Sequence, residues 1–197
     1  DLAITSAEGG RQGDALVNTL FTLAMKPEVD IVRREFAARN IAIPCFFDDT
    51  NIFGTDGHAM TQAFTRLSTL FADIHLNMQS TKCVLYAPNA DWSALAAAVN
   101  IPFTTTGITM TGTPVGTTAY VNACVSATAD KCIATAQRIV RAATFAFEHD
   151  IKKVVHPLFT LLRLCAGSAF TNKLRSVSPD ITGPHAQRID RALLDAA

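Results

Sequence analysis

The chain has 197 residues, of which 49% are hydrophobic and 17% charged, so it can bury one sizeable core or two small ones. This composition excludes an intrinsically disordered chain. No apolar run reaches the roughly 18 residues of a membrane-spanning helix, so we expect no membrane partner. The net charge is zero, which argues neither for nor against a nucleic-acid partner.

The first predicted elements are a short strand at residues 2–7 and a helix at residues 15–39. The helix is predicted from apolar residues that recur every three or four positions and share one face: Leu16, Leu20, Leu23 and Ala24. Proline lacks a backbone N–H, so Pro27 is expected to kink or restart the helix. The apolar stripe then continues with Val29, Val32 and Phe36. Asn40 is expected to end the helix.

Two strands are predicted next, at residues 41–46 and 51–53, joined by a turn that contains Asp48 and Asp49. Adjacent residues on a regular strand point to opposite faces, so two neighbouring carboxylates can share a ligand only at a turn. Mg²⁺ takes one or two carboxylates together with substrate phosphates. Aspartate is also a good turn former, so local chemistry leaves a metal site and a solvated turn both open.

The remaining elements complete an α+β fold class. Periodicity and turn residues predict a helix at 58–73, a strand at 83–87, a short Ala-rich helix at 91–99 and a hairpin within 103–118. The rest is predicted to be helical, at residues 122–148, 155–166, 168–176 and 184–196. The organisation is therefore α+β first and all-α last, with the break near residue 120.

Charge and cysteine distribution add two expectations. Residues 1–98 carry seven Lys/Arg and eleven Asp/Glu, and residues 99–197 carry ten and six, which leaves charges of −4 and +4. Two explanations stay open: the imbalance can arise by chance, or an acidic half that binds metal is joined to a basic half that contacts phosphates. The five scattered cysteines include no CxxC pair, so we expect a reducing, intracellular compartment. The chain starts at Asp1 without a secretion signal, so we expect that it begins inside a larger protein.

Three other segments are weak motifs when taken singly. Residues 9–14, GGRQGD, precede a helix and could bring backbone N–H groups to a phosphate or base, or could form an ordinary glycine turn. Residues 75–83 end near Lys82, which could meet a phosphate or simply be solvated. Residues 111–121 are rich in Thr and Gly, and a hairpin in a β-layer explains them equally well.

The order of these segments resembles the reverse transcriptases of non-long-terminal-repeat retrotransposons. Residues 11–14 (RQGD) resemble motif B of that family, and residues 46–49 (FFDD) resemble the aromatic-x-Asp-Asp box, motif C. Residues 76–82 resemble motif D, and residues 112–121 resemble the GxPxG segment at the primer grip, motif E. The resemblance covers nearly the whole chain, and the collinear order is its specific part.

The resemblance implies an RNA-directed DNA polymerase with a partial palm at residues 1–120 and a helical thumb region at residues 121–197. Two Mg²⁺ or Mn²⁺ ions would stabilise the attacking and leaving oxygens of nucleotide transfer. By similarity, Asp48 would ligate the catalytic metal and Asp49 would support the metal site. Lys82 would approach the leaving pyrophosphate as a charge or a proton donor.

The implied partners are an RNA template, a DNA primer and deoxynucleoside triphosphates, in the nucleus. Template and substrate contacts would come from five residues: Arg11, Gln12, Gly13, Phe46 and Phe47. The primer grip would contain four: Gly112, Pro114, Val115 and Gly116. The thumb would hold the duplex through basic side chains: Lys131, Arg138, Arg141, Lys152 and Lys153.

Several departures from the family pattern keep alternatives open. Ala15 stands where the family has Pro, and Phe47 stands where it has a small residue beside the carboxylates. Motif A, with the first metal-binding Asp, and the fingers are expected in an N-terminal segment of the parent protein, so the chain alone is expected to be inactive. One alternative is a decayed or repurposed palm–thumb domain that binds nucleic acid without catalysis. Another is an unrelated α+β interaction domain.

Overall fold

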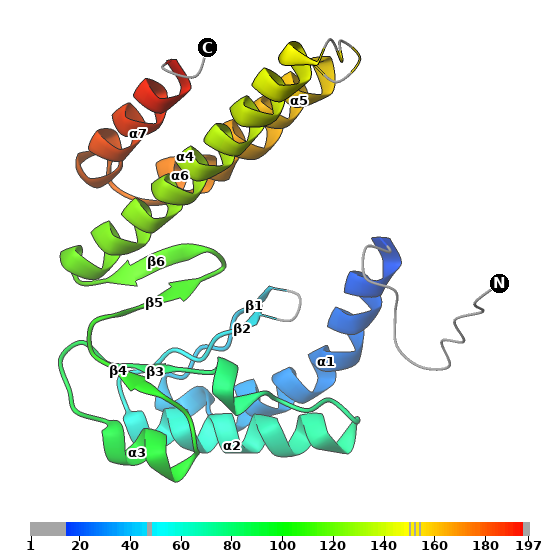
Figure 1. The fold of residues 1–197 in the computed structure, drawn as a ribbon. Coiled ribbons are helices and arrows are strands. Elements are labelled where there is room, and N and C mark those ends of the chain that lie inside the picture. The colour runs from blue at the N-terminus through cyan, green and yellow to red at the C-terminus, as the bar shows by residue number, and fades with distance from the viewer. Residues whose placement is uncertain (1–14, 47–48, 150, 152, 154, 195–197) are drawn as a thin grey trace. The chain divides into compact units, whose positions relative to one another are not determined.

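The computed structural model describes residues 15–46, 49–149, 151, 153 and 155–194 (Figure 1). These residues form a mixed α+β fold, which confirms the predicted fold class. The chain divides into two compact units, one of residues 1–87 with 91–103 and one of residues 88–90 with 104–197. The predicted strand at 2–7 and the GGRQGD segment lie outside the described residues. The predicted subdomain boundary at residue 120 stays a prediction.

The first helix, α1 (Ala15–Glu35), runs through Pro27 without a break, so the predicted restart there does not occur. The predicted single apolar stripe is wrong too. Leu16, Leu20 and Leu23 are exposed, whereas Met25, Val29 and Val32 are buried. The physical reason is helical geometry, because the nine residues between the centres of the two sets make about two and a half turns. The two sets therefore lie on opposite sides of one continuous helix.

The predicted hairpin after α1 is present. The chain turns in the 3₁₀ segment η1 (Ala37–Arg39), which ends at Asn40 in the left-handed conformation with φ 53°. Strands β1 (Cys45–Phe46) and β2 (Asp49–Thr50) then pair antiparallel, with Cys45 opposite Thr50 and Phe46 opposite Asp49. An isolated bridge joins Ala42 and Phe53 in the same register. The hairpin therefore extends over residues 42–53.

Helix α2 (Gly57–Asp73) completes the core of the first unit. Its N-cap is Asp56, whose carboxylate accepts a hydrogen bond from the Ala59 N–H at 3.1 Å. Its first residue, Gly57, must lack a side chain because a Cβ there would lie 2.7 Å from the Trp92 ring. The shared core draws on α1, the first hairpin strand and α2: Met25, Val29, Val32, Ile41, Ile43, Ala59, Ala63, Leu67 and Phe71.

The rest of the first unit is a set of short elements. The 3₁₀ turn η2 (Ser80–Lys82) precedes strand β3 (Leu85–Tyr86), and helix α3 (Ser93–Ala98) packs on α2. Strand β4 (Phe103–Thr104) pairs with β3, and the Leu85 N–H donates to the Pro102 carbonyl at 2.8 Å. The predicted strand and short helix are therefore both found, with shorter limits.

The second unit begins with the predicted hairpin of strands β5 (Gly107–Met110) and β6 (Thr113–Gly116). Met110 pairs with Thr113, which leaves a two-residue loop whose φ angles are 46° at Thr111 and 81° at Gly112. Two positive φ values define a type I′ turn, the connection that best fits the twist of a hairpin.

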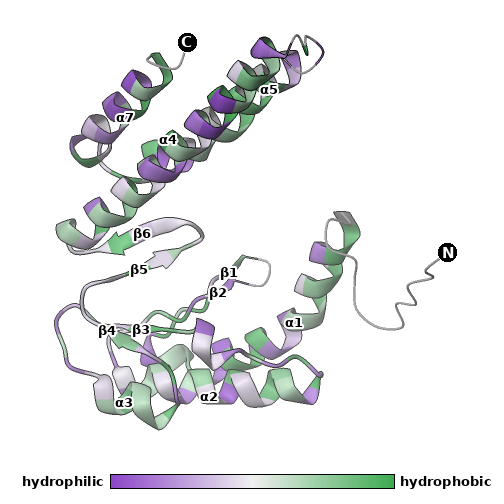
Figure 2. Ribbon diagram, in the orientation of Figure 1, coloured by the Kyte–Doolittle hydropathy of each residue, from purple (hydrophilic) through white to green (hydrophobic). Residues whose placement is uncertain are grey.

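Helix α4 (Thr118–Glu148) is the long helix of the second unit, and strand β6 and helices α5 and α7 all pack against it. Helix α5 (Val155–Leu161) continues into a π-helical stretch, Leu162–Gly167, before helices α6 (Thr171–Ser176) and α7 (Pro179–Leu194). Figure 2 shows hydrophobic and hydrophilic residues alternating along the ribbon of α4. The core of this unit joins α4, α7 and the start of α6: Val125, Ala129, Cys132, Phe170 and Ile189.

Helix α7 begins five residues before its predicted start at 184. The Ser178 hydroxyl accepts a hydrogen bond from the Asp180 N–H at 3.4 Å, and Pro179 opens the helix, where its missing N–H is not needed. Pro184 lies inside the helix. The predicted range missed the Ser-Pro pair upstream, where the helix actually starts.

Candidate metal and nucleic-acid sites

Asp49, one of the two predicted carboxylates, opens the second strand of the hairpin. Cross-strand partners in an antiparallel pair project to the same face, so Phe46 and Asp49 share a face. Ile41, Ile43 and Cys45 alternate with them and face the core. Phe46 is 62% exposed, and Asp49 is exposed as well. Residues 47 and 48 lie outside the described residues, so the roles predicted for Phe47 and Asp48 stay predictions, as do those of Arg11, Gln12 and Gly13.

Arg33 of α1 anchors the base of this hairpin. Its Nε and Nη2 atoms donate to the Ile43 carbonyl oxygen at 3.1 and 2.5 Å. Its Nη1 atom donates to Asp30 at 3.0 Å, and Lys26 also binds Asp30. The hydrogen bond from Lys26, with a smaller contribution from Arg33, lowers the pKa of Asp30. One guanidinium therefore ties the first hairpin strand to α1.

The predicted pyrophosphate-binding residue, Lys82, belongs to the same compact unit and is exposed. The loop that carries it is held from its start, because the Leu76 N–H donates to the Phe71 carbonyl at 2.8 Å. Leu76 and Met78 pack against the core of the first unit. Asp49 and Lys82, which the family resemblance assigns to the active site, are therefore both exposed and accessible to a ligand in solution.

The described residues include one of the two predicted metal ligands. Among them, no three His, Cys, Asp or Glu side chains come together as a metal-ion site. Asp49 supplies hard oxygen donors on an open surface, which suits Mg²⁺ or Mn²⁺ better than a softer metal. Burial raises the pKa of the Cys83 and Cys132 thiols, so these two cysteines stay protonated at neutral pH. Thiolate ligation by them is therefore disfavoured.

The predicted primer-grip residues form the type I′ hairpin of the second unit. Pro114 is buried and Val115 is 42% exposed. Gly112 has a positive φ, and a Cβ on Gly116 would lie 2.3 Å from the Thr106 carbonyl oxygen. Both glycines of the GxPxG segment are thus required by the backbone geometry of the hairpin itself. This requirement explains the motif without any ligand.

Helix α4 presents a basic face to solvent. Lys131, Arg138 and Arg141 are exposed, and the ion pairs among the described residues do not involve them. Further along the helix, the rings of Phe145 and His149 stack with centroids 4.0 Å apart. Lys153 is exposed too, whereas Lys152 lies outside the described residues. This basic face can contact phosphates, and a stacked aromatic pair can contact bases.

Comparisons with known proteins identify no relative. No protein-family model, no curated protein and no solved structure matches the chain. None of the helices in the described part of the chain is long and apolar enough to cross a membrane.

A polar cluster between α4 and α7 was not predicted. His185 is 8% exposed, its Nε2 lies 3.0 Å from Asn122 Oδ1, and its Nδ1 lies 3.2 Å from Arg188 Nη1. Arginine only donates, so Nδ1 accepts and the Nε2–H donates to Asn122. Arg188 also binds Asp130 at 2.6 Å. The i, i+3 spacing indicates that His185 and Arg188 are neighbours on one helix face. It does not indicate their partners Asn122 and Asp130, which lie about sixty residues away in the sequence.

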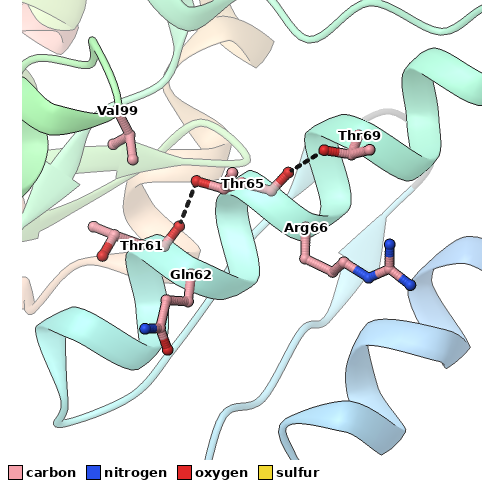
Figure 3. Close-up of a pocket in the computed structure, with 6 residues that line it drawn as sticks. All are labelled: Thr61, Gln62, Thr65, Arg66, Thr69 and Val99. Atoms are coloured by element: carbon pink, nitrogen blue, oxygen red, sulfur yellow. Dashed lines mark hydrogen bonds between the residues drawn. The ribbon is translucent and has the colours of Figure 1, made fainter.

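An open groove runs along α2 between its threonines and Val99 (Figure 3). The Thr65 and Thr69 hydroxyls donate to the carbonyls four residues before them, at 3.0 and 3.1 Å. Arg66 donates to both Glu35 oxygens, which lowers the pKa of that carboxyl. Thr65, Thr69 and Arg66 are therefore already hydrogen-bonded within the protein, which leaves them less able to hold a ligand.

Proposed function

We propose that the chain is a palm–thumb segment of an RNA-directed DNA polymerase of the non-long-terminal-repeat retrotransposon type. One observation carries the proposal: Phe46 and Asp49 pair at the end of a β-hairpin, with Asp49 on an open face and the opposite face packed on two helices. A carboxylate pair needs this arrangement if it is to serve an external substrate. An intracellular, nuclear location belongs to the same proposal.

In the proposed site, Asp48 and Asp49 hold a divalent metal ion, Mg²⁺ or Mn²⁺. The ion supplies charge stabilisation for the oxygens that attack and leave the phosphorus. Two carboxylates leave half of the charge of two divalent ions uncompensated, so a third carboxylate and the substrate phosphates are required. That third carboxylate belongs to motif A, in the fingers and palm segment that this proposal requires upstream. Lys82 carries the charge or proton for the departing pyrophosphate.

The second unit supplies the nucleic-acid contacts of the proposal. The hairpin with Gly112, Pro114, Val115 and Gly116 would contact the primer strand. The basic face of α4, formed by Lys131, Arg138 and Arg141, would contact duplex phosphates. These three exposed cations take part in none of the ion pairs among the described residues. This supports binding to a polyanion, with an affinity that falls strongly as the salt concentration rises.

A second candidate function rests on the same basic face. Phe47 is bulky where the family has a small residue beside the carboxylates. A palm–thumb domain that kept its duplex-binding helix and lost its chemistry would carry such a substitution. The basic face supports this function as well as the first, so the two candidates differ only in what the carboxylates do.

Primer extension separates the two candidates. The assay uses a chain that includes the upstream segment with the third carboxylate, an RNA template, a DNA primer and Mg²⁺ or Mn²⁺. The polymerase proposal predicts extension by the parent sequence, and loss of about 10³-fold or more with Asp48→Asn, because charge stabilisation is the main catalytic contribution. The matched control is Asp91→Asn, on the α3 side of the same unit.

The outcomes are distinct. Extension that survives Asp48→Asn unchanged refutes the metal role of the pair. Binding of duplex with no extension, by a chain whose upstream carboxylate is present, favours the non-catalytic candidate. Absence of any duplex binding at low salt removes both, and leaves an α+β interaction domain.

A further inference from the structure

A lysine buried in the second unit is bonded to the tip of the β5–β6 hairpin. Lys173 of helix α6 is 9% exposed, and its Nζ donates to the Gly112 carbonyl oxygen, 61 residues away in the sequence. Gly112 is the second residue of the type I′ turn. The contact therefore joins the last described short helix of this unit to the point where the hairpin reverses.

The neighbouring residue of α6 touches the same glycine. A Cβ on Gly112 would lie 2.9 Å from Asn172 Nδ2, so a side chain there would displace the end of the Asn172 side chain. The other end of the hairpin is held as well, because a Cβ on Gly107 would lie 2.3 Å from the Tyr120 ring of α4. Helix α4 thus supports the base of the hairpin and helix α6 supports its tip.

The chemistry of Lys173 is unusual for a residue that only fills space. Burying an ammonium group is unfavourable unless it is hydrogen-bonded, and lysine is rarely buried. Leucine or methionine would fill the same space without that cost. The amine is therefore explained by its hydrogen bond, which fixes the carbonyl of the turn.

We propose that Lys173 is a positioning residue that holds the tip of the β5–β6 hairpin against α6 and so sets the surface that the hairpin offers to a nucleic-acid backbone. The second half of the proposal rests on the proposed nucleic-acid function of the hairpin. The exposed residues of the hairpin are Thr109, Thr111, Gly112 and Val115, and threonine hydroxyls and backbone N–H groups are common donors to phosphate oxygens. Lys173 itself is too buried to be a phosphate contact.

Two measurements on the whole chain test the proposal. The first is amide hydrogen exchange at residues 107–116 in the free protein. Lys173→Met should speed exchange in β5 and β6 about tenfold, the loss expected for one hydrogen bond from a charged group, and Lys173→Arg should restore protection. The second is affinity for an RNA–DNA duplex over a salt series. Lys173→Met should weaken binding about fivefold without changing the slope of log K against log salt, because no phosphate contact is lost.

Lys131→Met is the matched control, because it makes the same substitution at an exposed position of α4. It should leave hairpin exchange unchanged and reduce the salt slope by about 0.9, the value for one phosphate contact. Lys173→Gln, which is shorter and uncharged, serves in place of Lys173→Met if that variant does not fold.

Each result is decisive. Unchanged exchange at residues 107–116 in a folded Lys173→Met variant overturns the proposal. A salt slope reduced by about one in that variant makes Lys173 a direct phosphate contact and overturns the positioning role. A parent chain that binds no duplex defeats the proposed function and the second half of this proposal, while the exchange measurement still decides whether Lys173 holds the turn.

Discussion

Leu67→Ala gives the sharpest test of the core that supports the carboxylate hairpin. Leu67 of α2 is 0% exposed and belongs to the same buried cluster as Val29 and Val32 of α1 and Ile43 of the hairpin. The substitution removes three carbon atoms from the point where the three elements meet. It leaves Asp48, Asp49 and the surface of the hairpin chemically unchanged.

The magnitude follows from the burial. Loss of three buried carbons costs about 2.4 kcal/mol in transfer free energy at about 0.8 kcal/mol each, and the cavity left behind raises the total for such sites toward 3–5 kcal/mol. Ala63 and Ala59, one and two turns earlier on α2, are also 0% exposed and are too short to fill the cavity. We therefore expect a loss of about 3–4 kcal/mol in the free energy of unfolding of this unit.

Urea unfolding followed by tryptophan fluorescence measures this loss. Trp92 is the single tryptophan of the chain, and it packs against Gly57 at the start of α2, within the first unit. With an m-value near 1.5 kcal/mol/M, the midpoint should fall by about 2 M. Leu20→Ala is the matched control, because Leu20 is 62% exposed. It should change the free energy of unfolding by less than about 0.5 kcal/mol.

A loss below about 1 kcal/mol for Leu67→Ala would show that the site is not a closed core. A Leu20→Ala variant that loses as much as Leu67→Ala would show that the N-terminal half of α1 is covered rather than exposed. Either result would contradict the packing that supports the hairpin.

Three further predictions concern other parts of the molecule. Gly107→Ala should destabilise the second unit by about 1–3 kcal/mol in thermal unfolding, because its Cβ would lie 2.3 Å from the Tyr120 ring, and the added substitution Tyr120→Ala should recover part of the loss. The hydrogen bond from Arg39, followed by that from the α2 backbone, lowers the pKa of Asp56. Its stabilising contribution is therefore present at neutral pH and lost as the pH falls below about 4, so the parent and Asp56→Ala should differ in stability at pH 7 and converge near pH 2. Arg138→Ala should lower the salt slope of duplex binding by about 0.9, and an unchanged slope would remove it from the phosphate-binding face.

Local rules predicted the elements whose signals agree with one another. Helix α2 has apolar residues at helical spacing, an aspartate N-cap and a glycine at its first turn, and its predicted and observed limits differ by one residue. The carboxylate hairpin was predicted from two β-prone runs, and the alternation of Ile41, Ile43 and Cys45 sets which face is buried. In both cases the decisive contacts are near in sequence.

Features that depend on distant partners could not be predicted in this way. The spacing of Leu16, Leu20 and Leu23 indicates an apolar face but not whether another element covers it, and in the structure they are exposed. Lys173 and His185 are polar residues whose burial makes sense only with partners about sixty residues away. The turn of the carboxylate hairpin is also shorter than predicted. Asp49 was expected in the turn, but it pairs with Phe46 as part of a strand, so only residues 47 and 48 separate the two strands in the sequence.

Binding of Mn²⁺ to the hairpin tests the central claim most directly. The measurement is paramagnetic broadening of backbone amide resonances during a Mn²⁺ titration of the chain, which detects weak binding by two carboxylates. The proposed function predicts that amides of residues 42–53 broaden first, and that Asp48→Asn or Asp49→Asn removes this effect while Asp30→Asn does not. Broadening that spares the hairpin, or that persists in both hairpin variants, would contradict a metal site at this carboxylate pair.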